Sequence, residues 1–240
     1  MRPFRSAAWS MVCLSLLAHA APAAEKEELG KSVEGRPIVA RSHGEADSPQ
    51  TVLLIASIHG SEPAGTPLVE RFEAWLAAHP DRWRGRRVVV IPVANPDGYA
   101  QRKRTNARGV DLNRNFPAGN RVERSLHGPA ALSEPESRAL MRALRAYAPD
   151  RVLSLHQPLE CVDYDGPGEE LAAAISAAID GRLPVKRLGG RPGSLGSYVG
   201  VDLGKPIITL ELPKGVEARG AEQLWDDYGQ GLVAFVLGAK

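Results

Sequence analysis

His59 and Glu62 stand three positions apart at the end of an apolar run, and both residue types bind zinc in proteins. The run, Val52 to Ile58, has the composition of a buried strand. Where such a strand turns into a helix, two side chains with this spacing can face one metal ion. A His-x-x-Glu pattern is common by chance, so the hypothesis of a metal site depends on a third ligand elsewhere in the chain.

His156 is the best candidate for that third ligand. A catalytic zinc ion takes three protein ligands and keeps one position open for water. His156 follows the apolar segment Val152 to Leu155, so it also lies at the mouth of a buried strand. The other histidines lie in the leading segment or in turn-like and polar settings: His19, His43, His79 and His127. We therefore predict that His59, Glu62 and His156 bind one metal ion.

Glu211 is placed to act as a general base. It ends the apolar run Ile207 to Leu210 and precedes the turn-forming sequence Pro213-Lys-Gly. Burial of a carboxylate raises its pKa toward the range that is useful for proton transfer. We predict that Glu211 takes a proton from attacking water and passes it to a leaving amine. The alternative is a partly exposed carboxylate at the end of a strand.

The segment Gly109-Val-Asp-Leu-Asn-Arg-Asn-Phe-Pro117 concentrates polar side chains in a short loop. Arg114 can pair with a carboxylate through two hydrogen bonds, and the adjacent Asn113 amide can donate to the same group. Such a pair would recognise the free C-terminus of a peptide. Asp111 can accept the second ring N–H of a metal-bound histidine, or it only forms a turn.

An arginine upstream of this segment can polarise a substrate carbonyl and stabilise the negative charge that develops on its oxygen. The basic run from Arg102 to Arg108 offers two candidates, Arg104 and Arg102. A solvated basic loop is the alternative explanation for the whole run.

Taken in order, these motifs resemble the zinc carboxypeptidase family, in its compact bacterial murein-peptide amidase branch. The shared pattern comprises His-x-x-Glu at 59–62, Asn-Pro-Asp-Gly at 95–98, the 109–117 segment, His156, and Glu211 followed by Leu-Pro. Three further segments are similar to the amidase branch rather than to digestive enzymes: Ser133 to Glu136, His156 to Val162 and Pro192 to Tyr198. The resemblance extends from about Thr51 to Pro213.

The resemblance implies one Zn²⁺ per chain and hydrolysis of a C-terminal amide bond by water that Glu211 activates. It assigns Asp111 to His59, and it favours Arg104 because the branch shares Arg-x-Asn-Ala-x-Gly-Val-Asp, the pattern at 104–111. The implied substrate is a small murein-derived peptide such as L-Ala-γ-D-Glu-meso-diaminopimelate. The second ammonium and carboxylate of diaminopimelate would need complementary charges, for which the candidates are Asp163, Asp165, Lys186 and Arg191.

Two other functions fit parts of the pattern. A zinc-dependent N-acyl-amino-acid deacylase of the aspartoacylase type has a similar His-x-x-Glu, Asp-Leu-Asn-Arg and His layout. The Asn-Arg-Asn-Phe run, the Leu-Pro after Glu211 and the lack of length for an appended β-domain favour the peptidase. The other function is binding of wall peptides without catalysis, and the presence of every ligand and of the base argues against it.

The elements that must position these residues are apolar runs of strand length alternating with helical patterns, which predicts an α/β fold. The predicted strands are Pro37 to Arg41, Thr51 to Ile58, Arg87 to Val93, Arg151 to Leu155 and Pro206 to Leu212. The predicted helices are Pro63 to Ala78, Glu134 to Tyr147 (with a capping box at Ser133 and Glu136), Glu169 to Ile179 and Ala221 to Leu237. We expect a single-domain, mostly parallel mixed β-sheet covered by helices on both faces.

An irregular stretch from Asn95 to Leu132 carries most of the polar motifs, and we interpret it as an active-site loop. His59, Asn95 and His156 each follow a predicted strand. Ligands of open α/β sheets gather at the carboxyl ends of strands, so these residues should converge there.

Residues 1–23 have the pattern of a signal peptide. Arg2 and Arg5 precede an apolar stretch, Ala7 to Leu17, that is too short to span a bilayer, and Ala-x-Ala sites follow it. We therefore expect residues 24–240 to form a catalytic domain in an exported compartment, most simply a bacterial periplasm. An N-terminal membrane anchor is the alternative.

Without those residues the chain has 28 basic and 28 acidic side chains, because two arginines are lost and no acid is. The missing basic excess argues against nucleic-acid binding. Cys161 is then the one remaining thiol, so no internal disulfide can form. We expect a small peptide as the substrate and no stable membrane anchor, while the sequence indicates no oligomeric state.

Overall fold

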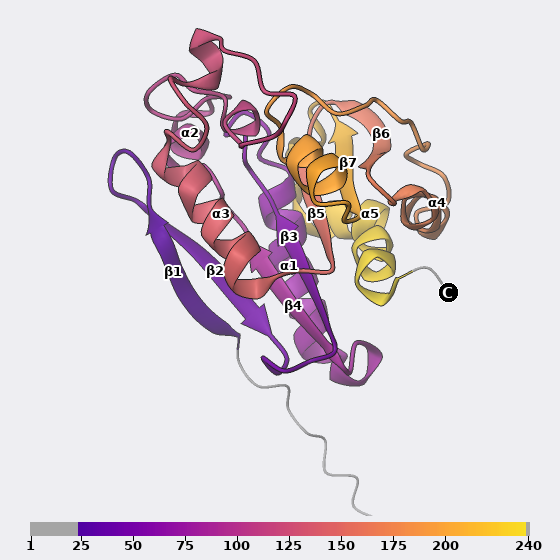
Figure 1. The fold of residues 1–240 in the computed structure, drawn as a ribbon. Helices are drawn as coiled ribbons and strands as arrows, with labels where there is room; N and C mark the ends of the chain where they lie inside the picture. The colour runs from indigo at the N-terminus through magenta and orange to yellow at the C-terminus, as the bar shows by residue number, and fades with distance from the viewer. Residues whose placement is uncertain (1–23, 239–240) are drawn as a thin grey trace, which may run out of the picture.

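The computed structural model describes residues 24–238, which form a seven-stranded mixed sheet with helices on both faces (Figure 1). The strands are β1 Glu25–Lys31, β2 Pro37–His43, β3 Gln50–Ile55, β4 Arg86–Ile91, β5 Arg151–His156, β6 Leu159–Asp165 and β7 Ile207–Pro213. Their order across the sheet is β1-β2-β4-β3-β5-β7-β6. The central strands β4, β3, β5 and β7 are parallel. The pairings of β1 with β2, β2 with β4, and β6 with β7 are antiparallel.

The central strands are covered on both faces, which explains their continuous apolar sequences. Val52 to Ile55 in β3 are completely buried. Because successive strand side chains point to opposite faces, one run supplies two cores. Val52 and Leu54 belong to one hydrophobic cluster, and Leu53 and Ile55 belong to the other.

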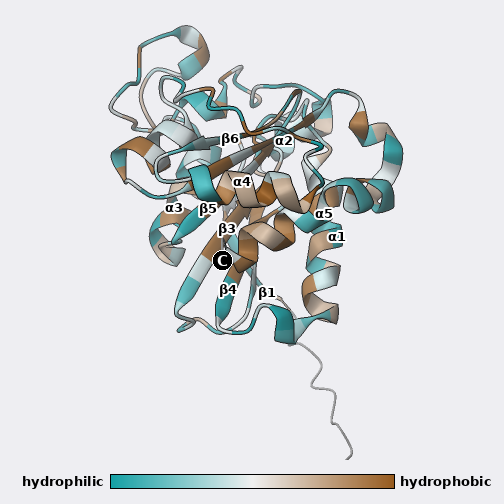
Figure 2. Cartoon of the chain, turned by 90° about the vertical axis from the view of Figure 1, so that its right-hand side faces the viewer, coloured by the Kyte–Doolittle hydropathy of each residue, from teal (hydrophilic) through white to brown (hydrophobic). Residues whose placement is uncertain are grey.

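The helices divide between the two faces of the sheet. They are α1 Gly65–Ala78, α2 Pro96–Gln101, α3 Pro135–Tyr147, α4 Glu169–Ala178 and α5 Gly220–Leu237. Residues of α1, α4 and α5 belong to one core cluster and residues of α3 to the other, and Figure 1 shows α3 in front of the sheet. In Figure 2 the middle of the central strands is largely hydrophobic, whereas many of the surrounding loops are hydrophilic.

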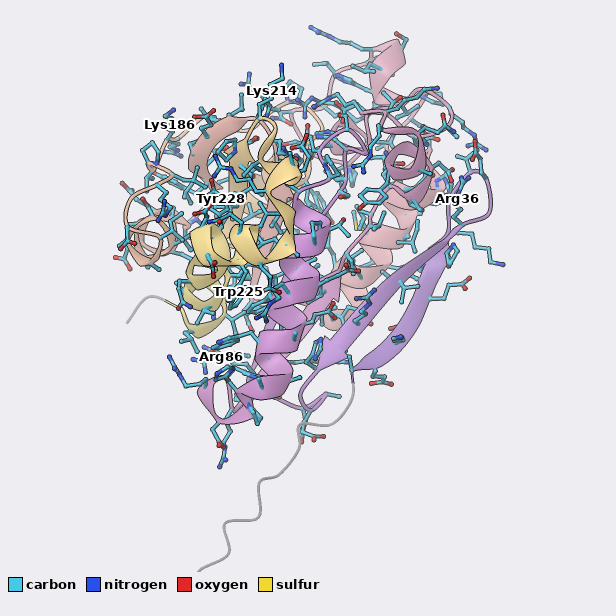
Figure 3. The ribbon with its side chains drawn as sticks, turned by 180° about the vertical axis from the view of Figure 1, so that it is seen from behind. Arg36, Arg86, Lys186, Lys214, Trp225 and Tyr228 are labelled. Atoms are coloured by element: carbon cyan, nitrogen blue, oxygen red, sulfur yellow. The ribbon has the colours of Figure 1, made fainter. Side chains whose placement is uncertain are left out.

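Aromatic packing joins α1 to α5. The rings of Phe72 and Trp75 stack with centroids 6.0 Å apart, and the centroid of Trp225 lies 6.4 Å from that of Trp75. Figure 3 shows Trp225 on α5 beside α1. Large aromatic side chains contribute much of the buried area in such contacts. This aromatic packing therefore fixes α1, which begins at Gly65, three residues after Glu62.

The predicted fold class is confirmed, and each predicted strand and helix is present with ends shifted by at most three residues. The prediction missed β1, β6 and α2. β1 is exposed along most of its length and rich in charge, so it lacks an apolar pattern. β6 has acidic residues where a buried strand would have apolar ones.

The capping box predicted for α3 is wrong. The N-cap is Glu134, and no side chain caps the helix. Ser133 Oγ donates to a Glu134 carboxylate oxygen at 2.8 Å instead. The Glu136 carboxylate accepts from the Val33 backbone N–H at 3.1 Å and from Asn106 Nδ2 at 3.1 Å. Glu136 therefore joins the β1–β2 hairpin to the active-site loop.

The stretch predicted as an irregular loop is anchored to the same hairpin. It contains α2 and two short 3₁₀ turns, Leu112–Arg114 and Ser125–His127. Asp97 in α2 is completely buried. It accepts hydrogen bonds from Ser32 Oγ at 2.7 Å and from the Glu34 backbone N–H at 2.9 Å, and Arg36 pairs with it. These contacts hold α2 in place although its neighbours lack regular structure.

α2 packs in turn on the chain segment that carries His59. A Cβ added to Gly60 would come within 1.9 Å of the Gly98 carbonyl carbon, so only glycine fits there. Asn95 Nδ2 donates to the Ile58 carbonyl oxygen at 3.3 Å. The position of His59 is therefore set by β3 on one side and by α2 on the other.

Residues 1–23, where the signal peptide is predicted, lie outside the described residues. Within 24–238, every helix is too short or too polar to cross a bilayer. Cys161 is a buried free thiol in β6.

Candidate active site

The residues predicted to form a metal site meet at the carboxyl ends of the parallel strands. His59 follows β3, Asn95 follows β4, and His156 is the last residue of β5. His156 is paired with Glu211 in the register of β5 and β7. The parallel centre of the sheet thus collects side chains that are far apart in sequence, as expected for ligands of an open α/β sheet.

His59, Glu62 and His156 form one buried cluster whose donor atoms all lie within 4.8 Å of one another. His59 Nδ1 is 3.0 Å from one Glu62 carboxylate oxygen, and His156 Nδ1 is 2.8 Å from the other. The two Nδ1 atoms are 3.2 Å apart. Each side chain therefore directs a metal-binding atom to the same centre.

The outer nitrogens of both histidines are already engaged. His59 Nε2 is 2.9 Å from Asp111 Oδ1, and His156 Nε2 is 2.9 Å from Ser154 Oγ. Hydrogen bonds of this kind hold the proton on the outer nitrogen and leave Nδ1 with its lone pair. Two lone pairs 3.2 Å apart repel each other, and a cation between them removes that repulsion. Two neutral imidazoles and a carboxylate are a common ligand set of catalytic zinc.

The two carboxylates that contact the histidines, Glu62 and Asp111, have lowered pKa values. Burial alone would raise the pKa of Glu62, but its short contacts with the His156 and His59 rings outweigh burial and hold that pKa well below its usual range. Asp111 behaves similarly, because its hydrogen bond with His59 and the charge of Arg104 also outweigh burial and lower its pKa. Both side chains are therefore anionic at neutral pH, as metal ligation and histidine orientation require.

Glu211 lies beside this cluster but is not part of it. The residue is only 8% exposed, and burial raises the pKa of its carboxyl. One of its oxygens accepts from the Leu159 backbone N–H at 3.3 Å. The side chain also lines the pocket that contains the histidines, so it faces the place where a substrate would lie.

The two arginine candidates occupy different environments. Arg104 lines the pocket and donates from Nε to Asp111 Oδ2 at 3.0 Å and from Nη1 to Glu62 Oε1 at 2.9 Å. Arg102 adopts a left-handed backbone conformation, and its guanidinium lies 5.2 Å from the centroid of the Tyr99 ring. Arg102 is not among the residues that line the pocket. The geometry therefore favours Arg104.

Asn113 and Arg114 also line the pocket. Asn113 Oδ1 accepts from the Leu195 backbone N–H at 2.9 Å, which turns the amide so that its Nδ2 can donate elsewhere. Arg114 Nη1 donates to the Asn113 carbonyl oxygen at 2.5 Å. Burial lowers the pKa of Arg114, and the nearby Arg104 and Arg191 charges lower it further. An anionic ligand would relieve this crowding of positive charge.

The pocket has a volume of about 220 Å³ and extends beyond the predicted site. Its remaining lining residues are Gln157, Pro158, Leu159, Asp163, Asp165, Leu188, Gly189, Arg191, Ser194, Gly196 and Thr209. Three of the four residues considered for a diaminopimelate side chain are therefore present. The fourth, Lys186, is exposed and lies at the edge of the molecule in Figure 3.

Sequence reasoning missed two supporting residues. Ser154 orients His156, and the spacing Ser-x-His on a strand, which places both side chains on one face, was the available signal. Gln157 donates its backbone N–H to Glu62 Oε2 at 3.2 Å, and its side-chain oxygen accepts from the Ala64 N–H at 3.1 Å. The segment His156 to Val162 includes Gln157 but gave it no role, because the contact depends on how β5 meets the start of α1.

Comparisons with known proteins agree with this arrangement. The family model for zinc carboxypeptidases matches residues 12–164. Murein peptide amidase A from Escherichia coli (strain K12) is 34% identical over 205 residues, which cover 78% of this chain and 81% of that protein. Murein peptide amidase A from Vibrio campbellii (strain ATCC BAA-1116) is 30% identical over 200 residues, covering 77% of each chain.

Two solved structures show the extent of the shared fold. The murein-tripeptide amidase from Escherichia coli O157 superposes with a TM-score of 0.68 at 28% identity, over 88% of this chain and 91% of that one. Carboxypeptidase A from Helicoverpa armigera superposes with a TM-score of 0.74 at 21% identity, over 90% of this chain and 69% of that one. At 21% identity, the similarity to the Helicoverpa armigera enzyme shows a shared fold and nothing more.

Proposed function

This chain belongs to the zinc carboxypeptidase family, and from that premise we propose that it removes meso-diaminopimelate from the C-terminus of small murein-derived peptides. It is a zinc-dependent peptidase. The observation that carries the proposed substrate is its similarity to murein peptide amidase A along most of both chains, at 34% identity. The proposed bond is the γ-D-glutamyl–diaminopimelate amide.

We assign zinc to the inward-facing Nδ1 atoms of His59 and His156 and to the Glu62 carboxylate. Bound there, zinc would supply a Lewis acid that polarises the scissile carbonyl and makes water more acidic. The fit rests on the short separation of the two Nδ1 atoms and on the engagement of both Nε2 atoms.

Glu211 is assigned as the general base and then the general acid. It takes a proton from water as the water oxygen bonds to the carbonyl carbon, and it delivers that proton to the leaving nitrogen as the C–N bond breaks. Burial supports the first half of this role, because a raised pKa makes the carboxylate a better proton acceptor. The donated proton is needed since an amine leaves far more readily than an amide anion.

Three side chains of the active-site loop are assigned to the substrate. Arg104 stabilises the negative charge on the former carbonyl oxygen, for which its guanidinium has donors in the pocket. Asn113 and Arg114 bind the free C-terminal carboxylate, with the planar guanidinium and the amide donating to it together. Asp111 holds the proton on the outer nitrogen of His59, at a separation of 2.9 Å.

We further propose that the enzyme works outside the cytoplasm. The support is the sequence of residues 1–23, with its basic start, short apolar stretch and Ala-x-Ala sites. An exported enzyme would meet peptides released from murein or stem peptides still attached to it.

The test is incubation of the purified protein with L-Ala-γ-D-Glu-meso-diaminopimelate, with and without a chelator, and zinc measured on the same sample. We expect chelator-sensitive release of free diaminopimelate, detected by mass, with about one zinc per chain. Intact tripeptide together with hydrolysis of N-acetyl-aspartate would replace the proposal with an N-acyl-amino-acid deacylase. Intact tripeptide together with cleavage of ordinary peptides would retain the peptidase and reject the murein substrate.

A further inference from the structure

The charged side chains of this protein are divided unevenly between part of the active-site loop and the rest of the chain. Residues 102–124 contain seven basic side chains and two acidic ones, Asp111 and Glu123. The other residues between 24 and 238 contain 20 basic and 26 acidic side chains. Residues 24–238 are thus almost neutral as a whole, and their excess of positive charge is concentrated in one segment.

This segment folds into one part of the molecule beside the pocket. The Asp111 backbone N–H donates to the Leu126 carbonyl oxygen at 2.8 Å, and the Phe116 backbone N–H donates to the Gly193 carbonyl oxygen at 3.0 Å. Figure 1 shows the segment, in magenta, above α2 and α3. Two of its arginines line the pocket, so its positive charge lies at the mouth of the candidate active site.

Most of the basic side chains in this segment are accessible to a partner. The five residues that are exposed form what we call the basic surface: Arg102, Lys103, Arg104, Arg108 and Arg124. Arg104 pairs with Glu62 and Asp111, and Arg108 lies 3.6 Å from a Glu134 carboxylate oxygen. Within residues 24–238, the other three make no ion pair. Their charges are therefore available to an anion from outside the chain.

The basic surface extends past the pocket that holds the catalytic groups. Arg104 lines that pocket, whereas Lys103, Arg108 and Arg124 do not. Arg124 instead lines a separate open hollow of about 520 Å³. A tripeptide confined to the catalytic pocket, whose volume is about 220 Å³, would leave these charges unused. A ligand that uses the whole basic surface must be longer than that peptide and must carry several negative charges.

We propose that the basic surface binds an anionic polymer across the mouth of the pocket, and that this polymer is murein with its stem peptides still attached. The proposed scissile bond uses the γ-carboxyl of D-glutamate, so the α-carboxylate of that residue stays free, and diaminopimelate adds further carboxylates. Such a polymer presents many negative charges in a row. The choice of murein rests on the proposed function, whereas the choice of a polyanion depends on the charges alone. The acidic remainder of the chain would turn the pocket toward the polymer.

Binding by exposed charges differs from binding inside the pocket in its response to salt. Salt screens exposed charges over about 10 Å at 0.1 M ionic strength. One exposed lysine or arginine beside a densely anionic surface raises affinity by roughly fivefold. A few such side chains therefore suffice for binding that is measurable at low salt and weak at high salt.

The experiment measures co-sedimentation of the zinc-loaded protein with purified murein sacculi over a range of salt concentrations. The protein carries Glu211→Gln, so that no stem peptide is cut during the measurement. The test variant adds Lys103→Glu and Arg124→Glu, two exposed residues outside the catalytic machinery. The matched control adds Arg82→Glu and Arg145→Glu, which change the charge equally. Both control residues are exposed and precede β4 and β5, at the opposite edge of the sheet.

We expect the test variant to bind sacculi at least about 10-fold more weakly than its parent at low salt, and the control to bind within about twofold. Affinity of the parent should fall by a similar factor between about 50 and 300 mM salt. Sacculi whose carboxylates have been converted to neutral methylamides should bind weakly. Equal losses in both variants, or undiminished binding to the methylamide form, would overturn the proposal. Tighter binding to phosphatidylglycerol vesicles than to sacculi would assign the surface to a membrane and overturn it too.

The active enzyme gives a second readout. In a chain with Glu211 intact, Lys103→Glu with Arg124→Glu should slow release of diaminopimelate from sacculi with tripeptide stems by at least about 10-fold and leave kcat on the soluble tripeptide unchanged. Equal slowing on both substrates would contradict a role for these residues in polymer binding. Thermal melting of each variant separates loss of folding from loss of binding.

Failure of this proposal differs from failure of the proposed function. Cleavage of the soluble tripeptide without salt-sensitive binding to sacculi would reject the basic surface as a murein site and leave an enzyme of released peptides. Salt-sensitive binding to sacculi without cleavage of any γ-glutamyl peptide would reject the proposed reaction and retain the surface. The two results come from separate measurements on the same protein.

Discussion

His156 and Glu211 are direct partners in the register of the parallel strands β5 and β7. One is a proposed zinc ligand and the other the proposed base, and neighbouring strands lie about 4.8 Å apart. The pairing of β5 with β7 therefore sets the spacing between the proposed zinc ligand and the proposed base, and no loop is involved. Residues assigned to the substrate, such as Arg104 and Arg114, come instead from the segment between β4 and α3.

Replacing Glu211 by glutamine should abolish proton transfer while leaving zinc bound. We expect kcat to fall by about 10²- to 10⁴-fold, since that is the usual contribution of a positioned acid–base group. Zinc content by metal analysis and kcat on the tripeptide measure the two effects separately. The exposed Glu160→Gln on the same strand pair is the control. A variant at position 211 that keeps near wild-type kcat would show that another group is the base.

Replacing Asp111 by asparagine, or Ser154 by alanine, should weaken zinc binding without removing a ligand. Each residue holds the outer nitrogen of one histidine, at 2.9 Å in both cases. Loss of such a partner usually costs about 10- to 100-fold in metal affinity. Competition with a zinc chelator of known affinity measures the change, and His79→Gln is the control. Unchanged zinc affinity in both variants would contradict the assigned histidine orientation.

Replacing Asn113 or Arg114 by alanine should impair peptides with a free C-terminus far more than C-terminally amidated ones. Only the free carboxylate can accept the two charge-assisted contacts that these side chains offer. The ratio of kcat/KM for the two substrate forms is the measurement, and the exposed Arg124→Ala in the same loop is the control. Equal losses on both forms would mean that this pair does not recognise the carboxylate.

Replacing Asp97 by asparagine should lower stability in a manner that depends on pH. Burial alone would raise the pKa of Asp97, but hydrogen bonds from Ser32, Glu34 and Arg36 outweigh it and lower that pKa in the folded protein. The ionised carboxylate therefore stabilises the fold above its unfolded-state pKa of about 3.9, and this contribution is lost as pH falls through the lower folded value.

We expect Asp97→Asn to cost about 1–3 kcal/mol of unfolding free energy at pH 7, with the difference from wild type shrinking below pH 4. Urea unfolding at several pH values, with chelator present throughout, measures it. The exposed Asp47→Asn serves as the control. A difference that stays constant from pH 7 to pH 3 would show that the charge of Asp97 is not responsible.

The sequence predicted the centre of the molecule better than its edges. Strands β3, β4, β5 and β7 are apolar because both of their faces are covered, so hydrophobic pattern alone located them and the site residues at their ends. Strand β6 was missed because one face forms a pocket wall, where Asp163 and Asp165 replace apolar residues. These polar residues in the pocket wall removed the pattern that would have identified β6 as a strand.

The interactions that fix the active-site loop could not be predicted from the sequence pattern either. Asp97 and Glu136 are acids that pattern reasoning places at the surface or at a helix cap. Both are completely buried and bind the β1–β2 hairpin, through contacts that span 61 to 103 positions in sequence. Hydrogen bonds of that range depend on the folded arrangement, and local spacing does not encode them.

Anomalous diffraction at the zinc absorption edge, from crystals of the purified active protein, would locate the metal ion itself. We expect one peak at about 2.0–2.2 Å from His59 Nδ1, His156 Nδ1 and a Glu62 carboxylate oxygen. Glu211 should lie beside that peak without binding it. A peak on the Nε2 side of either histidine, or catalytically active crystals with no zinc at this cluster, would show that the zinc site is assigned wrongly.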